Sequence, residues 1–200
     1  MGYSNFKSLK QTLKRLKLEE TDINLFPSIE PVAPSDWLKM TLEIAEKMPL
    51  TNEKSKSERV ISPILTEAIM PFMDYATLYS GEDLYVDEKN DLNGPCDFFI
   101  AKHAKKQVMQ APIITLAEAK DEDFDHGQGQ CLAQMYAAQL FNEQEGHPQS
   151  CIYGCAMTDG IWKFMKLEGN QAYIDNKTYY LNDLPNILGV FHQIIKFYLA

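Results

Sequence analysis

Two apolar runs separated by a short polar segment constrain the fold of this chain more than any other feature. The first run is CDFFIAK, residues 96–102, and the second is IITLAEAK, residues 113–120. Aromatic and β-branched runs of this length are typical of strands, and two of them joined by a polar loop predict an antiparallel hairpin. In such a pair the start of the first strand lies beside the end of the second. The hairpin therefore predicts that Asp97 comes close to Glu118.

The second run also carries a base next to its acid. Side chains two apart on a strand share a face, so we expect Ile114, Leu116, Glu118 and Lys120 to point one way and the small alanines to point the other. Two carboxylates about 4 Å apart repel by about 4 kcal/mol at an effective dielectric near 20, so Asp97 and Glu118 together need a cation or a shared proton. Lys120 supplies part of that charge. A divalent metal ion is one candidate for the rest, and an ion-paired triad without a ligand is the alternative.

Composition narrows the classes of protein. The 200 residues are 45% hydrophobic, enough for a full core, and the formal net charge is −9. Such an acidic chain is not expected to coat nucleic acid non-specifically. No apolar run approaches the roughly 20 residues that span a bilayer, and the four cysteines lack zinc-site spacing, so we expect a cytoplasmic protein with no membrane contact. Two basic clusters stand against the acidic background: Lys7, Lys10, Lys14, Arg15 and Lys17, and Lys102, Lys105 and Lys106.

The order of the segments predicts an α/β fold, with a mixed central sheet flanked by helices. Residues 1–52 contain two amphipathic helical patterns interrupted by prolines, and we interpret them as a helical N-terminal extension. Residues 53–200 are expected to form the α/β domain. It opens with a helix over residues 57–74 that carries Glu58 and Glu67, the latter expected at the helix surface, and it ends with several strands and an apolar helix. Trp162 and Phe164 alternate with Lys163 and are expected in the core.

Taken in order, these motifs resemble the PD-(D/E)xK nuclease superfamily, whose core is restriction-endonuclease-like. Asp97 stands at the head of a strand, a hairpin follows, and Glu118-Ala119-Lys120 closes the next strand before a helix. SERVISPIL resembles the first helix of the N-terminal nuclease domain of type I restriction enzyme motor subunits. EAKDEDFDHGQGQCLAQMYAAQLF resembles the E-x-K strand and the following helix of that domain, and YGCAMTDGIWKFMKL resembles its late hairpin. The resemblance covers residues 57–168, and Cys96 replaces the proline expected before the aspartate.

The resemblance implies a role for each matching residue. Asp97 and Glu118 would be metal ligands together with the Ala119 carbonyl, and Glu58 would approach the same ion, which would be Mg²⁺ or Mn²⁺. Lys120 would orient or deprotonate the attacking water and balance charge on the phosphate, so Asp97, Glu118 and Lys120 form the catalytic set. The helix bearing Gln130, Gln134 and Tyr136 would orient the site or contact the nucleic-acid backbone, and both glutamines are candidate substrate-binding residues.

The resulting expectation is a metal-dependent nuclease that cleaves nucleic acid, with DNA favoured over RNA. One alternative is a nuclease-like module that binds nucleic acid or a protein partner without cutting. The net charge and the acidic run Asp121, Glu122, Asp123 and Asp125 favour that alternative, because they repel phosphate. A third reading is a metal-free structural domain whose N-terminal helix mediates assembly, and homo-oligomer formation stays open.

Overall fold

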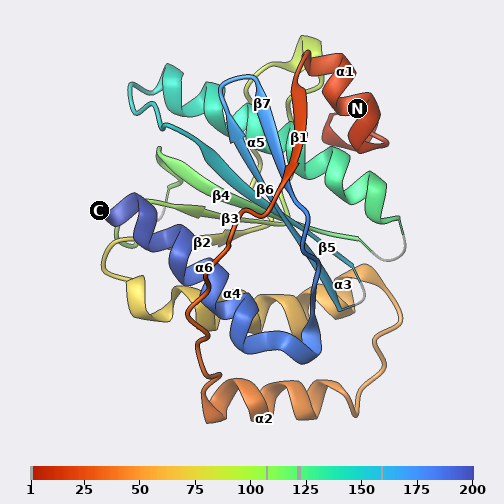
Figure 1. Ribbon diagram of the computed structural model, residues 1–200, viewed down its shortest axis with the longest axis vertical. Coiled ribbons are helices and arrows are strands. Elements are labelled where there is room, and N and C mark those ends of the chain that lie inside the picture. Colours follow the sequence, from red (N-terminus) through yellow and green to blue (C-terminus); the bar gives the residue numbers. More distant parts are fainter. Residues whose placement is uncertain (1, 107, 121–122, 159) are drawn as a thin grey trace.

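The computed structural model describes residues 2–106, 108–120, 123–158 and 160–200. It shows one mixed sheet between two layers of helices, so the predicted α/β class is confirmed (Figure 1). One face of the sheet packs on α1 (Leu9–Leu16) and α5 (Phe124–Gln144). The other packs on α4 (Ser62–Ile69) and α6 (Leu184–Leu199). α2 (Asp36–Ala45) lies outside this second layer, and α3 (Glu53–Lys56) precedes a π-helical turn, Ser57–Ile61, that leads into α4.

The described residues contain an eight-stranded sheet in the order β1-β7-β6-β5-β4-β3-β2, with β8 paired to β6. The strands are β1 (Glu19–Ile23), β2 (Thr77–Ser80), β3 (Phe98–Ala101), β4 (Ile113–Ala119), β5 (Ile152–Thr158), β6 (Ile161–Glu168), β7 (Gln171–Asp175) and β8 (Tyr179–Tyr180). Short 3-10 turns occupy Tyr3–Asn5, Met70–Phe72, Glu88–Asn90 and Leu181–Asp183. β1 runs parallel to β7 and β4 parallel to β5, and the other pairs are antiparallel.

The predicted hairpin is present. β3 and β4 are antiparallel, with Phe98 opposite Ala117 and Phe99 opposite Leu116. α5 then carries the chain back across one face of the sheet, which makes β5 parallel to β4. The register shifts between Ile100 and Ala101, and the alternation of side chains along β4 shifts with it. The prediction that Ile114 shares a face with Leu116 is therefore wrong. Ile114 packs in the cluster with α4 and α6, whereas Leu116 faces α5.

The N-terminal segment differs from the predicted helical extension. α1 and α2 are present, but residues 19–23 form the edge strand β1, with Glu19 opposite Gln171. Phe6 and Leu13 are buried in the cluster that surrounds α5. The strand EETDI was missed because four of its five side chains are exposed, so no apolar alternation marks it. Its position depends on hydrogen bonds to β7, which local sequence does not encode.

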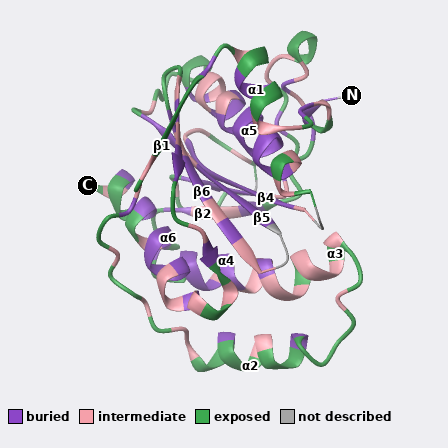
Figure 2. Cartoon of the chain, turned by 45° about the vertical axis from the view of Figure 1, so that its right-hand side comes forward, coloured by how far each residue is buried: buried purple, intermediate pink, exposed green. Residues whose placement is uncertain are grey.

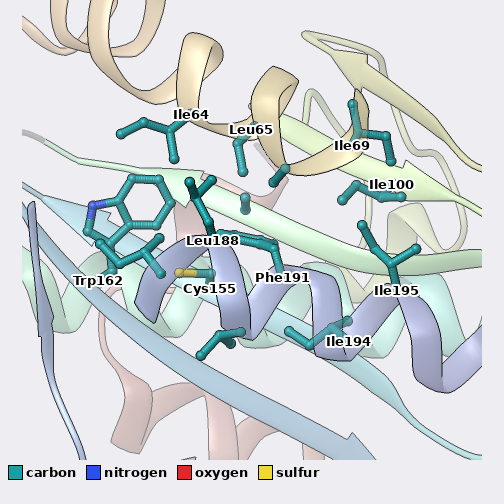
Figure 3. Close-up of a cluster of buried hydrophobic side chains, with 14 of the residues drawn as sticks. Ile64, Leu65, Ile69, Ile100, Cys155, Trp162, Leu188, Phe191, Ile194 and Ile195 are labelled. Carbon is teal, nitrogen blue, oxygen red and sulfur yellow. The ribbon is translucent and has the colours of Figure 1, made fainter. Parts of the chain in front are cut away.

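Two apolar clusters hold the sheet to its helices, one on each face. In the burial view the central strands are mainly buried and α2 shows an exposed outer side (Figure 2). Figure 3 shows the cluster on the α4 and α6 side, where Trp162 and Cys155 from the sheet meet Leu188 and Phe191 from α6. The core role predicted for Trp162 is confirmed, and Phe164 is also buried. Within the described ranges, no helix has the length and apolar character required to cross a bilayer.

Candidate functional site

The hairpin brings Asp97 to the end of β4. Asp97 immediately precedes β3, and its Oδ2 accepts a hydrogen bond from the backbone N–H of Ala119 at 2.8 Å. Glu118, one residue earlier on β4, is almost fully buried, with 2% of its surface exposed. The two carboxyl groups interact electrostatically, and each lies in a poorly hydrated place. The convergence that the register of a hairpin predicts is therefore present at this edge of the sheet.

Each oxygen of Glu118 has a partner. Lys120 Nζ lies 2.9 Å from Oε1, and Gln134 Nε2 donates to Oε2 at 2.8 Å. Glu118 and Lys120 lie two positions apart on the face toward α5, as the strand alternation predicts. The backbone N–H of Lys120 donates to the Met157 carbonyl at 2.8 Å, which extends the β4–β5 pairing to the lysine and fixes where its side chain begins.

The charges of this cluster are out of balance. Burial and repulsion from Asp97 raise the pKa of Glu118 to about 7, although Lys120 and Gln134 act in the opposite direction. Burial also raises the pKa of Asp97, against the Ala119 hydrogen bond and Lys120. Burial alone lowers the pKa of Lys120, but attraction to Glu118, Asp97 and Glu53 outweighs it and the pKa is raised. Lys120 is thus held as a cation, and the carboxyl groups still favour additional positive charge.

Glu53 is part of this cluster and was missed in the sequence. Its Oε2 lies 3.6 Å from Lys120 Nζ, and its side chain is 43% exposed. Glu53 is the first residue of α3, which begins with a capping box between Asn52 and Ser55. That Asn-x-x-Ser signal marks the helix start and could have placed an acidic side chain in its first turn. It did not indicate which part of the sheet the helix faces.

Two hollows open at the cluster. One of about 260 Å³ is lined by Glu53, Lys54, Ser57, Glu58, Ser80, Gly81 and Asp97. The other, of about 90 Å³, is lined by residues that include Glu53, Ala119, Lys120 and Trp162. Glu58 therefore lines the same opening as Asp97, and its approach to a metal ion stays a prediction. It is 62% exposed and lies 3.8 Å from Lys54 Nζ.

The donor set fits a hard divalent cation in its chemistry. Asp97, Glu118, Glu58 and the Ala119 carbonyl offer only oxygen, which Mg²⁺ and Mn²⁺ prefer. The raised pKa values of Asp97 and Glu118 have the sign expected where a positive charge is lacking. Among the side chains that the structure describes, no group of three or more His, Cys, Asp or Glu residues is arranged to hold a metal ion. A bound ion would have to compete with Lys120 for Glu118.

The two glutamines of α5 that were predicted to contact substrate are buried. Gln134 is fully buried and Gln130 is 7% exposed. The amide of Gln134 orients Glu118, so the predicted contact between Gln134 and substrate does not fit its position. For Gln130 that contact stays a prediction. Tyr136 is partly buried and packs on the α5 cluster. At the other end of α5, a Cβ on Gly127 would lie 3.1 Å from Lys120 Cγ, so the glycine allows the helix to approach the lysine closely.

The predicted surface position of Glu67 is wrong. Glu67 is buried, and its carboxylate accepts hydrogen bonds from the backbone N–H and the hydroxyl of Ser35 at 2.7 and 2.9 Å. These bonds hold the start of α2.

Of the acidic run after Lys120, residues 121 and 122 lie outside the described residues, as does residue 159 in the late hairpin turn. Asp123 caps α5 through the His126 N–H, and Asp125 accepts from the Leu9 N–H.

No protein-family model matches the chain, and searches of curated proteins and of solved structures likewise found no match.

Proposed function

We propose that the protein is a metal-dependent nuclease that hydrolyses phosphodiester bonds, acting on DNA in preference to RNA, in the cytoplasm. The observation that carries the proposal is the cluster of Asp97, Glu118 and Lys120 beside an open hollow, with the pKa values of both acids raised. A structural ion pair needs no second buried carboxylate. The resemblance of the same residues to the PD-(D/E)xK pattern supports the assignment.

The residues divide the chemistry between them. Asp97, Glu118, the Ala119 carbonyl and Glu58 would hold Mg²⁺ or Mn²⁺, which would polarise the phosphodiester when bound. Lys120 stays protonated here, so its role is to orient the attacking water and to balance negative charge on the phosphate. Gln134 holds the Glu118 carboxylate in place, and Glu53 pairs with the ammonium group of Lys120.

A nuclease-like module that binds without cutting is the second candidate. Both oxygens of Glu118 already have partners in Lys120 and Gln134, and the net charge of −9 opposes a phosphate backbone. In such a module the cluster would stabilise the end of β4, and binding would depend on other surfaces.

Cleavage assays decide between the two candidates. Purified protein incubated with DNA or RNA in Mg²⁺ or Mn²⁺ should nick or degrade it, and chelator should stop the reaction. Lys120→Ala should abolish cleavage because it removes the charge beside the phosphate. Lys166→Ala is the matched control, because Lys166 is also a lysine paired with an acid, Glu168 on β6. This variant should cleave as wild type does. Equal cleavage by wild type and Lys120→Ala would overturn the proposal.

Thermal melts test the metal site without substrate. Asp97→Asn removes the charge that repels Glu118 while keeping an oxygen for the Ala119 N–H, so in chelator it should be neutral or mildly stabilising. Millimolar Mn²⁺ should raise the melting temperature of wild type by mass action and leave the variant unchanged. A variant that melts much lower in chelator, combined with no Mn²⁺ response in wild type, would instead identify a salt-bridge cluster.

A further inference from the structure

An exposed row of four lysines follows α1. The row consists of Lys7, Lys10, Lys14 and Lys17. Lys10 and Lys14 lie one turn apart on the helix, Lys7 directly precedes the N-cap, and Lys17 is the C-cap. The opposite side of the helix is buried, with Thr12 and Leu13 toward α5. α1 lies at the outer surface of its layer, near the N-terminus (Figure 1), and its outward side is exposed (Figure 2).

Contacts within the protein do not account for this row. Across the part of the chain that the structure describes, none of the four lysines forms an ion pair. Arg15 on the same helix is different, because it pairs with Asp91 at 2.6 Å and lies over the Phe6 ring at 4.5 Å. Its role is therefore structural, and the lysines are left facing solvent.

Helix stability accounts for only part of the row. Cations stabilise the C-terminal end of a helix and destabilise the N-terminal end. Lys14 and Lys17 lie at the favourable end, but Lys7 and Lys10 lie at the unfavourable one, and the first turn of α1 carries no acidic residue. Asp125 of α5 supplies a negative charge at that end through the Leu9 N–H, and the four lysine side chains remain exposed.

The N-terminal end of α1 is joined to the helix that contacts the candidate site. The Leu9 N–H donates to Asp125 Oδ1 at 2.9 Å, and Thr12 Oγ1 donates to the Gly129 carbonyl at 3.0 Å. Gly127, two residues from each of these positions and therefore on the other side of α5, lies against the side chain of Lys120. The row therefore begins beside the first turns of α5, which pack on the candidate catalytic lysine.

We propose that Lys7, Lys10, Lys14 and Lys17 bind the phosphate backbone of nucleic acid and guide it toward the cluster at Lys120. The proposal rests on the proposed function, in which nucleic acid is the substrate. On a protein of net charge −9, a positive row favours backbone contact on the face that carries it, because acidic surface repels phosphate. Such contacts set the position of a nucleic acid without reading its sequence.

Binding measured in chelator tests the row separately from cleavage. The probe is a short fluorescent duplex DNA, titrated between about 50 and 200 mM salt. The test variant replaces the four lysines by glutamine. The control variant replaces four other exposed lysines, Lys39 of α2, Lys47 just after α2, Lys177 of the loop after β7 and Lys196 of α6, so that both variants lose four charges. Melting curves establish that each is folded, and the double variant Lys10→Gln/Lys14→Gln is used if the quadruple variant is not.

The row predicts a specific salt dependence. Each neutralised phosphate contributes about −0.9 to the slope of log affinity against log salt, so loss of four contacts should reduce the slope by about 3 to 4 and weaken binding at low salt at least about tenfold. The control should bind within about twofold of wild type. Equal loss in both variants, or row-dependent binding to anionic vesicles with no binding to DNA, would overturn the proposal. If the protein cleaves DNA but its binding does not depend on the row, the proposed role of the row is overturned and the nuclease proposal stands. If binding depends on the row but no cleavage occurs, the nuclease proposal is overturned and the role of the row stands.

Discussion

The two helical layers that cover the sheet are made of different side chains. On the α4 and α6 side, aromatic rings meet edge to face: Phe191 lies 5.9 Å from Trp162 and 5.3 Å from Phe164 between ring centroids. On the α5 side, the buried helix carries amides, Gln128, Gln130, Gln134 and Asn142. Two of these have identified roles in the sheet: Gln134 binds Glu118, and Asn142 binds both the N–H and the C=O of Ile113.

This difference indicates how the fold accommodates a buried acid. A carboxylate buried without a hydrogen-bond donor would cost several kcal/mol, a cost that Glu67 on α4 avoids by accepting hydrogen bonds from Ser35. The α5 layer provides an amide donor where β4 ends. We infer that the α4 and α6 layer contributes mainly stability, whereas the α5 layer contributes the polar groups that position the site.

The largest expected effect is in the aromatic layer. Phe191→Ala should lower the free energy of unfolding by about 3–5 kcal/mol, because it opens a cavity between Trp162 and Phe164. Phe197→Ala, on the same helix but 50% exposed, is the control and should cost well under half as much. Denaturant unfolding measures both. A cost below about 1 kcal/mol for Phe191→Ala would contradict the assignment of stability to this layer.

The α5 layer should respond through hydrogen bonds. Asn142→Ala leaves the N–H and C=O of Ile113 unpaired in the interior, and at about 1–3 kcal/mol for each group the loss should be on the order of 3 kcal/mol. Asn142→Asp keeps an acceptor for the Ile113 N–H but loses the donor to its carbonyl, so its loss should be distinct from that of alanine. Equal stability of wild type and Asn142→Ala in denaturant would show that the amide is dispensable.

The pH dependence of stability tests the buried acid. The pKa of Glu118 is raised from an ordinary value of 4.5 to about 7 in the folded protein. Its contribution to stability is therefore fully present below about pH 4.5 and is lost as pH rises through about 7, because the unfolded chain releases the proton first. In chelator, wild type should lose on the order of 2 kcal/mol relative to Glu118→Gln between about pH 5 and 8. Parallel pH profiles of the two proteins would refute the raised pKa.

The smallest expected effect on stability is at the contact between α5 and Lys120. In Gly127→Ala, the gain in helix propensity of up to about 1 kcal/mol is offset by crowding against Lys120 Cγ, so the net change should stay below about 1 kcal/mol. Displacement of Lys120 should nevertheless reduce cleavage several-fold. Gln144→Ala, exposed at the far end of α5, is the control for both measurements. Unchanged cleavage in Gly127→Ala would show that this close approach does not position the lysine.

Much of the candidate site could be predicted because it depends on short-range rules. The pairing of strands 98–101 and 113–119 follows from their composition and the loop between them, and that pairing places Asp97 beside Glu118. The common face of Glu118 and Lys120 follows from strand alternation. The expectation failed for Ile114, because the register shift opposite it is not encoded by the apolar pattern.

Other features depended on contacts between distant segments. Glu53 joins the site only because α3 lies over the end of β4. Its partner there, Lys120, lies 67 residues further along the chain. Glu67 is buried because the Ser35 backbone reaches it. Gln134 occupies a helix position where packing and ligand contact have the same local pattern, so sequence could not decide between them.

The sequence by itself determined most of the element types, the hairpin and the three residues at its open end, because hydrophobic periodicity and strand pairing act over short separations. Only the tertiary structure decided that β1 completes the sheet, that Gln134 and Glu53 contact Glu118 and Lys120, and that the lysine row on α1 begins beside the first turn of α5. The physical reason is that burial and electrostatic coupling depend on which elements meet in space. A charged strand such as residues 19–23 carries no local signal of its partner until β7 supplies the hydrogen bonds.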